Sequence, residues 1–118
     1  SPRALHVLEF VTDLTPAVRR IPGPLEFANM ITGGDIHPDG TRIVLRDYVS
    51  AQEFALPAGE PFERIFQQQA RVISLFGELQ GEGICYTLDG REWITTSEVR
   101  EFRMTRCPLY AVPATGPQ

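Results

Sequence analysis

Lysine is absent from this sequence of 118 residues, and all eleven basic residues are arginine. These arginines are scattered along the chain, and fifteen acidic residues leave a net charge of −4 and a pI near 5.1. The sequence has no basic stripe of the kind that follows a phosphate backbone, which argues against nucleic-acid binding. We attribute the arginine bias mainly to the codon usage of a GC-rich genome, and an anion-binding surface is the alternative.

Cysteine is nearly as scarce, with Cys85 and Cys107 as the only two. A structural zinc site needs four ligands, usually in close pairs, so this spacing predicts no zinc site. We expect two buried free thiols, because Cys85 lies in an apolar strand pattern. A single disulfide is the alternative if the protein is exported. No apolar run approaches the roughly 20 residues of a transmembrane helix.

Catalytic motifs are missing as well. The sequence has no glycine-rich phosphate loop, no Gly-x-Ser-x-Gly turn and no His-Glu-x-x-His helix. The two histidines, His6 and His37, are not expected to be catalytic partners. His37 is predicted to cap a turn beside Asp39, with a metal-binding or acid–base role as the alternative. No catalytic residue is assigned.

Ten glycines and ten prolines divide the chain into short segments with strand character. The predicted strands are 4–11, 17–21, 30–37, 42–48, 53–56, 71–76, 83–87, 92–97 and 109–112. Residues 61–70 instead place Phe62, Ile65 and Phe66 at helical spacing, which predicts a short amphipathic helix. We expect a surface insertion whose Phe side chains pack on a sheet edge, and a partner-binding helix is the alternative.

An internal repeat relates residues 34–43 to residues 84–93. Each segment is a strand, an Asp-Gly turn and a second strand, and Asp39 and Asp89 lie 50 positions apart. Glycine supplies the positive φ that a tight turn needs, without a Cβ penalty. A period of this length is typical of β-propeller blades, which are antiparallel sheets of four strands arranged around an axis.

The sequence therefore predicts an all-β protein made of antiparallel propeller blades, about two and a quarter of them. Residues 1–29 would end a preceding blade, and residues 30–80 would form a complete blade with the helical insertion. Residues 81–113 would form a last blade without its outer strand, and residues 114–118 a tail. Nine strands cannot close a ring of at least four four-stranded blades, so we expect part of a longer propeller. A compact β-sandwich-like domain is the alternative.

Two stretches carry a family resemblance: ITGGDIHPDG at 31–40 with IVLR at 43–46, and QGEGICYTLDG at 80–90. They resemble the repeats of TolB-type and tryptophan–aspartate-type propellers, although His37 stands where Ser is commoner. Over residues 31–112 the chain is similar to the C-terminal portion of uncharacterised exported bacterial propellers. More distantly it resembles phytase-related and esterase-like propellers. The resemblance implies a secreted or periplasmic location, and partners that are the remainder of the propeller or a symmetry copy.

Four polar residues near the inner strands are the predicted ligand-binding site. They are Asp35, Arg46, Glu82 and Glu98, which flank the two turns at matched positions. Carboxylates at the mouth of a propeller channel could hold Ca²⁺, or bind a polar ligand beside Arg46. The favoured alternative is an Arg–carboxylate network that joins adjacent blades without a ligand. Tyr86 and Trp93 are predicted to be inter-blade core.

Two classes of function follow from these predictions. The first is a ligand-binding or scaffold module of an exported propeller. The second, which the more distant resemblance implies, is part of a hydrolase of phosphate or carboxylic esters. A hydrolase of the phytase kind would gather several acidic residues around bound cations, whereas a binding module would have a pocket without metal.

Overall fold

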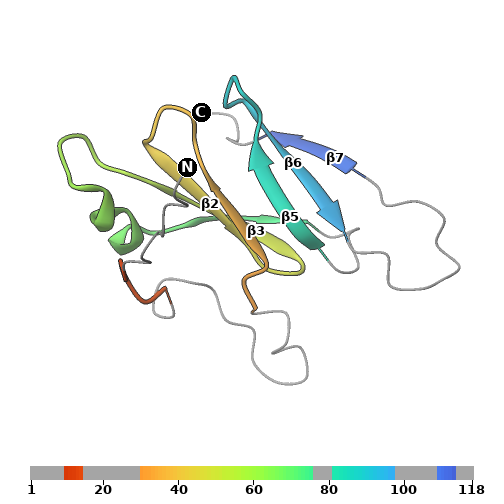
Figure 1. Ribbon diagram of the computed structural model, residues 1–118, viewed down its shortest axis with the longest axis horizontal. Helices are drawn as coiled ribbons and strands as arrows, with labels where there is room; N and C mark the ends of the chain where they lie inside the picture. The colour runs from red at the N-terminus through yellow and green to blue at the C-terminus, as the bar shows by residue number, and fades with distance from the viewer. Residues whose placement is uncertain (1–9, 15–29, 76–80, 98–108, 114–118) are drawn as a thin grey trace, which may run out of the picture.

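The computed structural model describes residues 10–14, 30–75, 81–97 and 109–113. They form two antiparallel sheets that lie face to face (Figure 1). The first sheet has the order β1 (Gly33–Ile36), β2 (Arg42–Arg46), β3 (Ser50–Ala55), β4 (Arg71–Ser74). The second has the order β5 (Gly81–Tyr86), β6 (Glu92–Ser97), β7 (Leu109–Pro113). Each sheet is thus a meander in which consecutive strands are neighbours, the topology of a propeller blade.

The two Asp-Gly hairpins are confirmed and have the same register. Ile36 pairs with Ile43 beside the first turn, and Tyr86 pairs with Trp93 beside the second, 50 positions later. In each turn the glycine N–H donates to the carbonyl three residues earlier, at 2.8 Å. The turn glycines, Gly40 and Gly90, have φ values of 77° and 71°. Positive φ is the reason for glycine at both positions.

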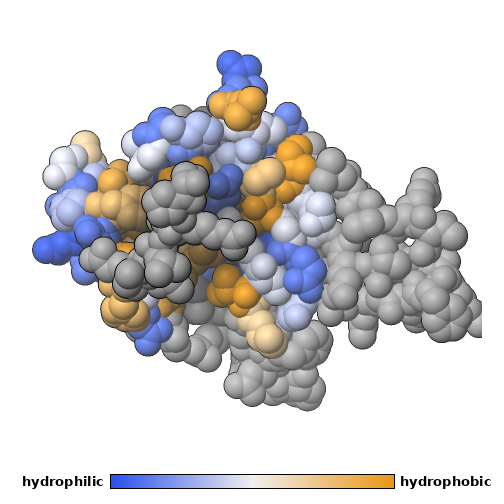
Figure 2. Space-filling view, in the orientation of Figure 1, coloured by the Kyte–Doolittle hydropathy of each residue, from blue (hydrophilic) through white to orange (hydrophobic). Residues whose placement is uncertain are grey.

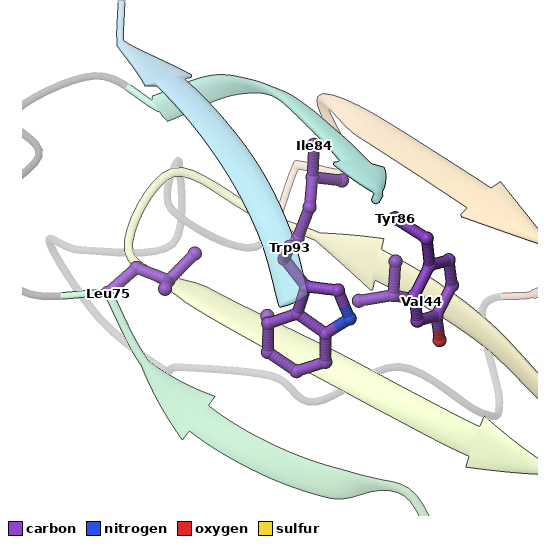
Figure 3. Packing of buried hydrophobic residues seen from close by; sticks show 6 residues of the cluster. Val44, Leu75, Ile84, Tyr86 and Trp93 are labelled. Carbon is purple, nitrogen blue, oxygen red and sulfur yellow. The ribbon is translucent and has the colours of Figure 1, made fainter. Parts of the chain in front are cut away.

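An apolar cluster fills the space between the sheets (Figure 3). It consists of Val44 and Ala51 from the first sheet, Leu75 directly after β4, and Ile84, Tyr86 and Trp93 from the second sheet. The predicted core role of Tyr86 and Trp93 is therefore confirmed. The backbones of β1 and β5 lie close together: a Cβ added to Gly33 would stand only 2.7 Å from the carbonyl oxygen of Glu82.

The opposite face of the first sheet is covered by the insertion between β3 and β4. This insertion holds the 3₁₀ helix η2 (Phe62–Gln67), in which Ile65 is buried against Ile43, Leu45 and Phe54. Phe66 meets Phe54 edge-to-face at 5.8 Å. The predicted helix over 61–70 is thus shorter, and its aromatic side chains pack on a sheet face rather than on an edge. It ends early because Gln68 is already extended.

Other strand bounds differ from the sequence prediction for physical reasons. The strand predicted at 53–56 is β3, which starts at Ser50; residues 50–54 are all buried, so the polar–apolar alternation that marks a half-exposed strand is missing. At the N-terminal end, Phe10 and Val11 are exposed and not in a strand, which corrects the end of the strand predicted at 4–11. The remainder of that strand and the strand predicted at 17–21 lie outside the described residues.

Cys85 is an exposed free thiol, so the expectation that it is buried is wrong. Its neighbours Ile84 and Tyr86 point toward the first sheet, and alternation along β5 turns Cys85 to the opposite face. Cys107 lies outside the described residues. Figure 2 shows apolar side chains reaching the surface in patches separated by polar ones. Among the described residues, the exposed large apolar side chains are Phe10, Val11, Met30, Ile31, Ile36, Val72 and Leu88.

Candidate functional site

Arg46, a predicted ligand-binding residue, is completely buried and bonded to main-chain oxygens. Its Nε donates to the carbonyl of Asp47 at 3.0 Å, and its Nη2 donates to that of Tyr48 at 3.4 Å. Its Nη1 crosses to the second sheet and donates to the carbonyl of Gly83 at 3.2 Å. The guanidinium group therefore ties β2 and the loop after it to β5.

Asp35 makes the corresponding contact from β1. Its Oδ2 accepts a hydrogen bond from the backbone N–H of Tyr86 at 2.8 Å, and its Oδ1 accepts one from the N–H of Ile36 at 2.9 Å. Asp35 and Arg46 thus both bond to the backbone of β5 in the opposite sheet. Both residues were predicted to lie in a network of arginine and carboxylate side chains that joins adjacent blades, but their partners across the junction are backbone atoms.

Of the two remaining predicted site residues, only Glu82 lies within the described part of the chain, and its backbone carbonyl faces Gly33 of β1. Glu82 is half-buried in β5. Glu98 lies outside the described residues. In the part of the chain that is described, no three His, Cys, Asp or Glu side chains are grouped as a metal ion would require. Binding of Ca²⁺ or a polar ligand by the four residues stays a prediction.

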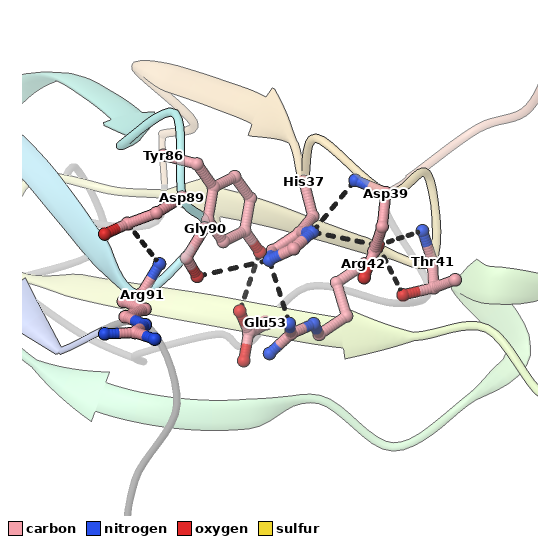
Figure 4. A network of polar contacts seen from close by, with 9 residues as sticks. All are labelled: His37, Asp39, Thr41, Arg42, Glu53, Tyr86, Asp89, Gly90 and Arg91. Atoms are coloured by element: carbon pink, nitrogen blue, oxygen red, sulfur yellow. Dashed lines mark hydrogen bonds and ion pairs between the residues drawn. The ribbon is translucent and has the colours of Figure 1, made fainter.

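His37, which was predicted only to cap a turn, makes polar contacts through both of its ring nitrogens (Figure 4). The predicted contact with Asp39 is confirmed, since Nδ1 lies 3.1 Å from the backbone N and 2.8 Å from Oδ1 of Asp39. On the other side of the ring, Nε2 lies 2.8 Å from Nη2 of Arg42 and 3.1 Å from the carbonyl oxygen of Gly90. His37 therefore reaches from the first hairpin to the turn of the second.

Gly90 is buried beneath that imidazole. A Cβ on Gly90 would overlap the His37 ring, whereas a Cβ on Gly40 would meet nothing within 4 Å. The second turn therefore needs glycine for two reasons, its positive φ and the ring that covers it. The first turn needs glycine only for its φ.

Tyr86 belongs to the polar cluster formed by His37, Asp39, Arg42 and Gly90, which it contacts through its ring and extends to Glu53 through its hydroxyl group. The ring meets His37 edge-on at a centroid distance of 4.9 Å. The hydroxyl group donates to Oε2 of Glu53 at 2.6 Å, and both side chains are buried. Burial, followed by the hydrogen bond to the Glu53 carboxylate and its charge, raises the pKa of Tyr86 above its ordinary value. The hydroxyl group therefore stays protonated and remains a hydrogen-bond donor.

The two turn aspartates share one arrangement at the exposed end of each hairpin. Oδ1 of Asp39 accepts bonds from the hydroxyl and backbone N–H of Thr41, at 2.6 and 2.9 Å. Oδ1 of Asp89 accepts bonds from the hydroxyl of Thr87 and the N–H of Arg91, at 2.6 and 3.0 Å. These hydrogen bonds lower the pKa of both carboxyl groups.

Glu53 and Arg42 are the members of the cluster that sequence reasoning missed. The available signal was a carboxylate within a strand that is otherwise apolar or neutral, because a charge buried at such a position needs a partner. The identity of that partner, Tyr86, depends on how the sheets dock and is not encoded by local spacing.

Comparison with known proteins assigns the chain to no family. No protein-family model and no curated protein matches the chain. One similar solved structure is described as "The structure of putative TolB from Agrobacterium tumefaciens", with 16% sequence identity and a TM-score of 0.47. The match covers 75% of this chain and 28% of that protein, so this chain spans little more than a quarter of its length. Within the described residues, no helix is long and apolar enough to cross a membrane.

Proposed function

We propose that this chain is part of a β-propeller and acts as a ligand-binding or scaffold module. The observation that carries the proposal is the repeated hairpin: two sheets with one register, 50 positions apart, dock face to face. In such an architecture residues 30–80 form one blade and residues 81–113 the next, and residues 1–29 end a preceding blade. The remainder of the propeller, or a symmetry copy, is the proposed partner. Export to the periplasm or outside the cell remains a prediction from the family resemblance.

The use made of the polar side chains favours a scaffold. Arg46 and Asp35 bond to the backbone of the opposite sheet, and Tyr86 bonds to Glu53 across the same junction. Charged groups used in this way hold two sheets in a fixed register. The ester-hydrolase alternative has no comparable support within the described residues, where His37 contacts Asp39, Arg42, Gly90 and the ring of Tyr86 but no serine or cysteine.

Substitution of Arg46 tests the scaffold role. Arg46→Met keeps the apolar stem but removes three donors, including the one to Gly83, and we expect a loss of about 3 kcal/mol in unfolding free energy. Arg91→Met, at an exposed turn position, is the matched control and should be nearly neutral.

Calcium calorimetry and a turnover assay separate the remaining roles. Heat of Ca²⁺ binding that Glu82→Gln abolishes would identify a ligand-binding module rather than a pure scaffold. Hydrolysis of a nitrophenyl ester or phosphate that is lost in Asp35→Asn or Glu82→Gln would contradict the proposed function and support the hydrolase.

A further inference from the structure

Each ring nitrogen of His37 faces one hydrogen-bond donor and one acceptor. Nδ1 faces the backbone N–H of Asp39 at 3.1 Å and the carboxylate of the same residue at 2.8 Å. Nε2 faces the guanidinium of Arg42 at 2.8 Å and the carbonyl oxygen of Gly90 at 3.1 Å. The site can therefore satisfy the ring with a proton on either nitrogen or on both. Which partners are used depends on the protonation state, and only Gly90 belongs to the other sheet.

In the neutral ring the shorter pair of contacts is the stronger one. Both 2.8 Å contacts involve a charged partner, and charge-assisted hydrogen bonds are shorter and stronger than neutral ones. Their use places the proton on Nδ1, where it is donated to Asp39, and leaves Nε2 to accept from Arg42. All of the ring's bonds then stay within the hairpin that carries it, and the Gly90 carbonyl receives no proton from the ring.

Protonation of the ring changes the partner of Nε2. A proton taken from solvent onto Nε2 removes the lone pair that accepted from Arg42, and the cationic ring repels the guanidinium. The acceptor within reach is the carbonyl of Gly90. We propose that His37 is a proton-operated latch: it bonds within the first hairpin when neutral and across the junction to Gly90 when charged.

The charged groups around the ring have opposing effects on its protonation. On its own hairpin, Asp39 favours the cation and Arg42 opposes it. On β5, the neutral ring of Tyr86 meets the imidazole in a T-shaped contact. The Tyr86 hydroxyl group donates to the Glu53 carboxylate of β3. In the turn of the second sheet, Asp89 and Arg91 flank Gly90 with opposite charges (Figure 4).

NMR of the ring nitrogens and of the Gly90 carbonyl carbon tests the latch directly. A chain with His6→Gln leaves His37 as its single histidine. We expect an unprotonated Nε2 and a protonated Nδ1 at high pH. On acidification Nε2 should gain its proton, and the Gly90 carbonyl signal should shift with the same midpoint.

The variant Arg42→Met removes the competing donor, so neutral His37 should move its proton to Nε2 and bond to Gly90 at every pH. The shift of the Gly90 carbonyl on titration should then be largely lost. In Arg91→Met, which changes a charge of the second turn outside the ring contacts, the titration shift should persist. A protonated Nε2 at high pH in the parent chain would overturn the proposal. A Gly90 carbonyl chemical shift that stays constant while His37 is protonated would overturn it as well. Both results are obtained on the parent chain, so neither depends on whether Arg42→Met folds.

Discussion

The imidazole of His37 lies over the α-carbon of Gly90, 53 residues along the chain, in the space that any other residue would fill with its Cβ. The equivalent glycine of the first hairpin, Gly40, has nothing above it. One turn is thus buried beneath the neighbouring hairpin and the other is open. The pair forms a natural comparison, because φ differs little between the two glycines.

Alanine at the two turn glycines should separate strain from docking. Gly40→Ala should lower the unfolding free energy by about 1–2 kcal/mol, the cost of the left-handed conformation for a residue with a Cβ. Gly90→Ala bears the same cost and also displaces His37, and we expect about 2–5 kcal/mol in total. Urea unfolding monitored by Trp93 fluorescence measures both. Equal losses would show that the imidazole does not rest on Gly90.

Tyr86 and Glu53 should be coupled energetically. Tyr86→Phe leaves the buried Glu53 carboxylate without the 2.6 Å bond from the hydroxyl group, at an expected loss of about 1.5–3 kcal/mol. Glu53→Gln keeps an acceptor of similar shape and should cost less. Urea unfolding of the two single variants and the double variant gives the coupling energy, and strictly additive losses would argue against the hydrogen bond.

The raised pKa of Tyr86 has a consequence at alkaline pH. Because the folded state holds the phenolic proton more tightly than the unfolded state, this contribution to stability is complete below the ordinary tyrosine pKa of about 10 and is lost as pH rises beyond it. Titration of phenolate absorbance in folded protein should therefore be nearly unchanged by Tyr86→Phe near pH 10. A clear loss of phenolate signal there would mean that Tyr86 ionises normally.

The lowered pKa values of the turn aspartates give stability a pH dependence of the opposite sign, at acid pH. The lowered pKa of Asp39 means that its contribution is present above the ordinary aspartate value of about 3.9 and is lost as pH falls through the lower folded value. Thr41→Val removes the hydroxyl donor, the largest cause of the shift, and should raise the pKa of Asp39. Asp89, whose donors are Thr87 and Arg91, is the internal control. Carboxyl NMR titration reads both residues in one sample.

The sequence predicted those parts of the fold that depend on local chemistry. Asp-Gly at 39–40 and 89–90 identified both hairpins, because positive φ leaves a residue signature. The start of β3 was missed, because residues 50–54 are buried and their pattern does not alternate. At the site, Asp35 and Arg46 were recognisable as polar residues in apolar strands. Their partners are the N–H of Tyr86 and the carbonyl of Gly83, and backbone atoms carry no residue identity that a sequence could reveal.

The internal repeat also predicts where a further sheet would dock on the first one. Ile36 occupies the place in the first hairpin that Tyr86 occupies in the second, yet Ile36 is 49% exposed and Tyr86 only 7%. Ile36 pairs with Ile43 on the face of the first sheet that packs against η2. Ile43 and Leu45, which η2 covers, are buried, so the uncovered part of that face lies along β1. We expect Ile36 to meet an apolar partner in the remainder of the propeller or a symmetry copy.

Light scattering over a wide range of concentrations tests this expectation on the chain itself. The parent chain should associate as concentration rises, and Ile36→Arg should weaken that association because the charge would be buried without a partner. Leu88→Arg is the matched control, since Leu88 is 98% exposed at the tip of the second turn, where the first hairpin has the exposed Pro38. If the association came from nonspecific contact between exposed apolar side chains, Leu88→Arg would weaken it at least as strongly as Ile36→Arg. A chain that stays monomeric throughout would show that no copy of this chain covers β1.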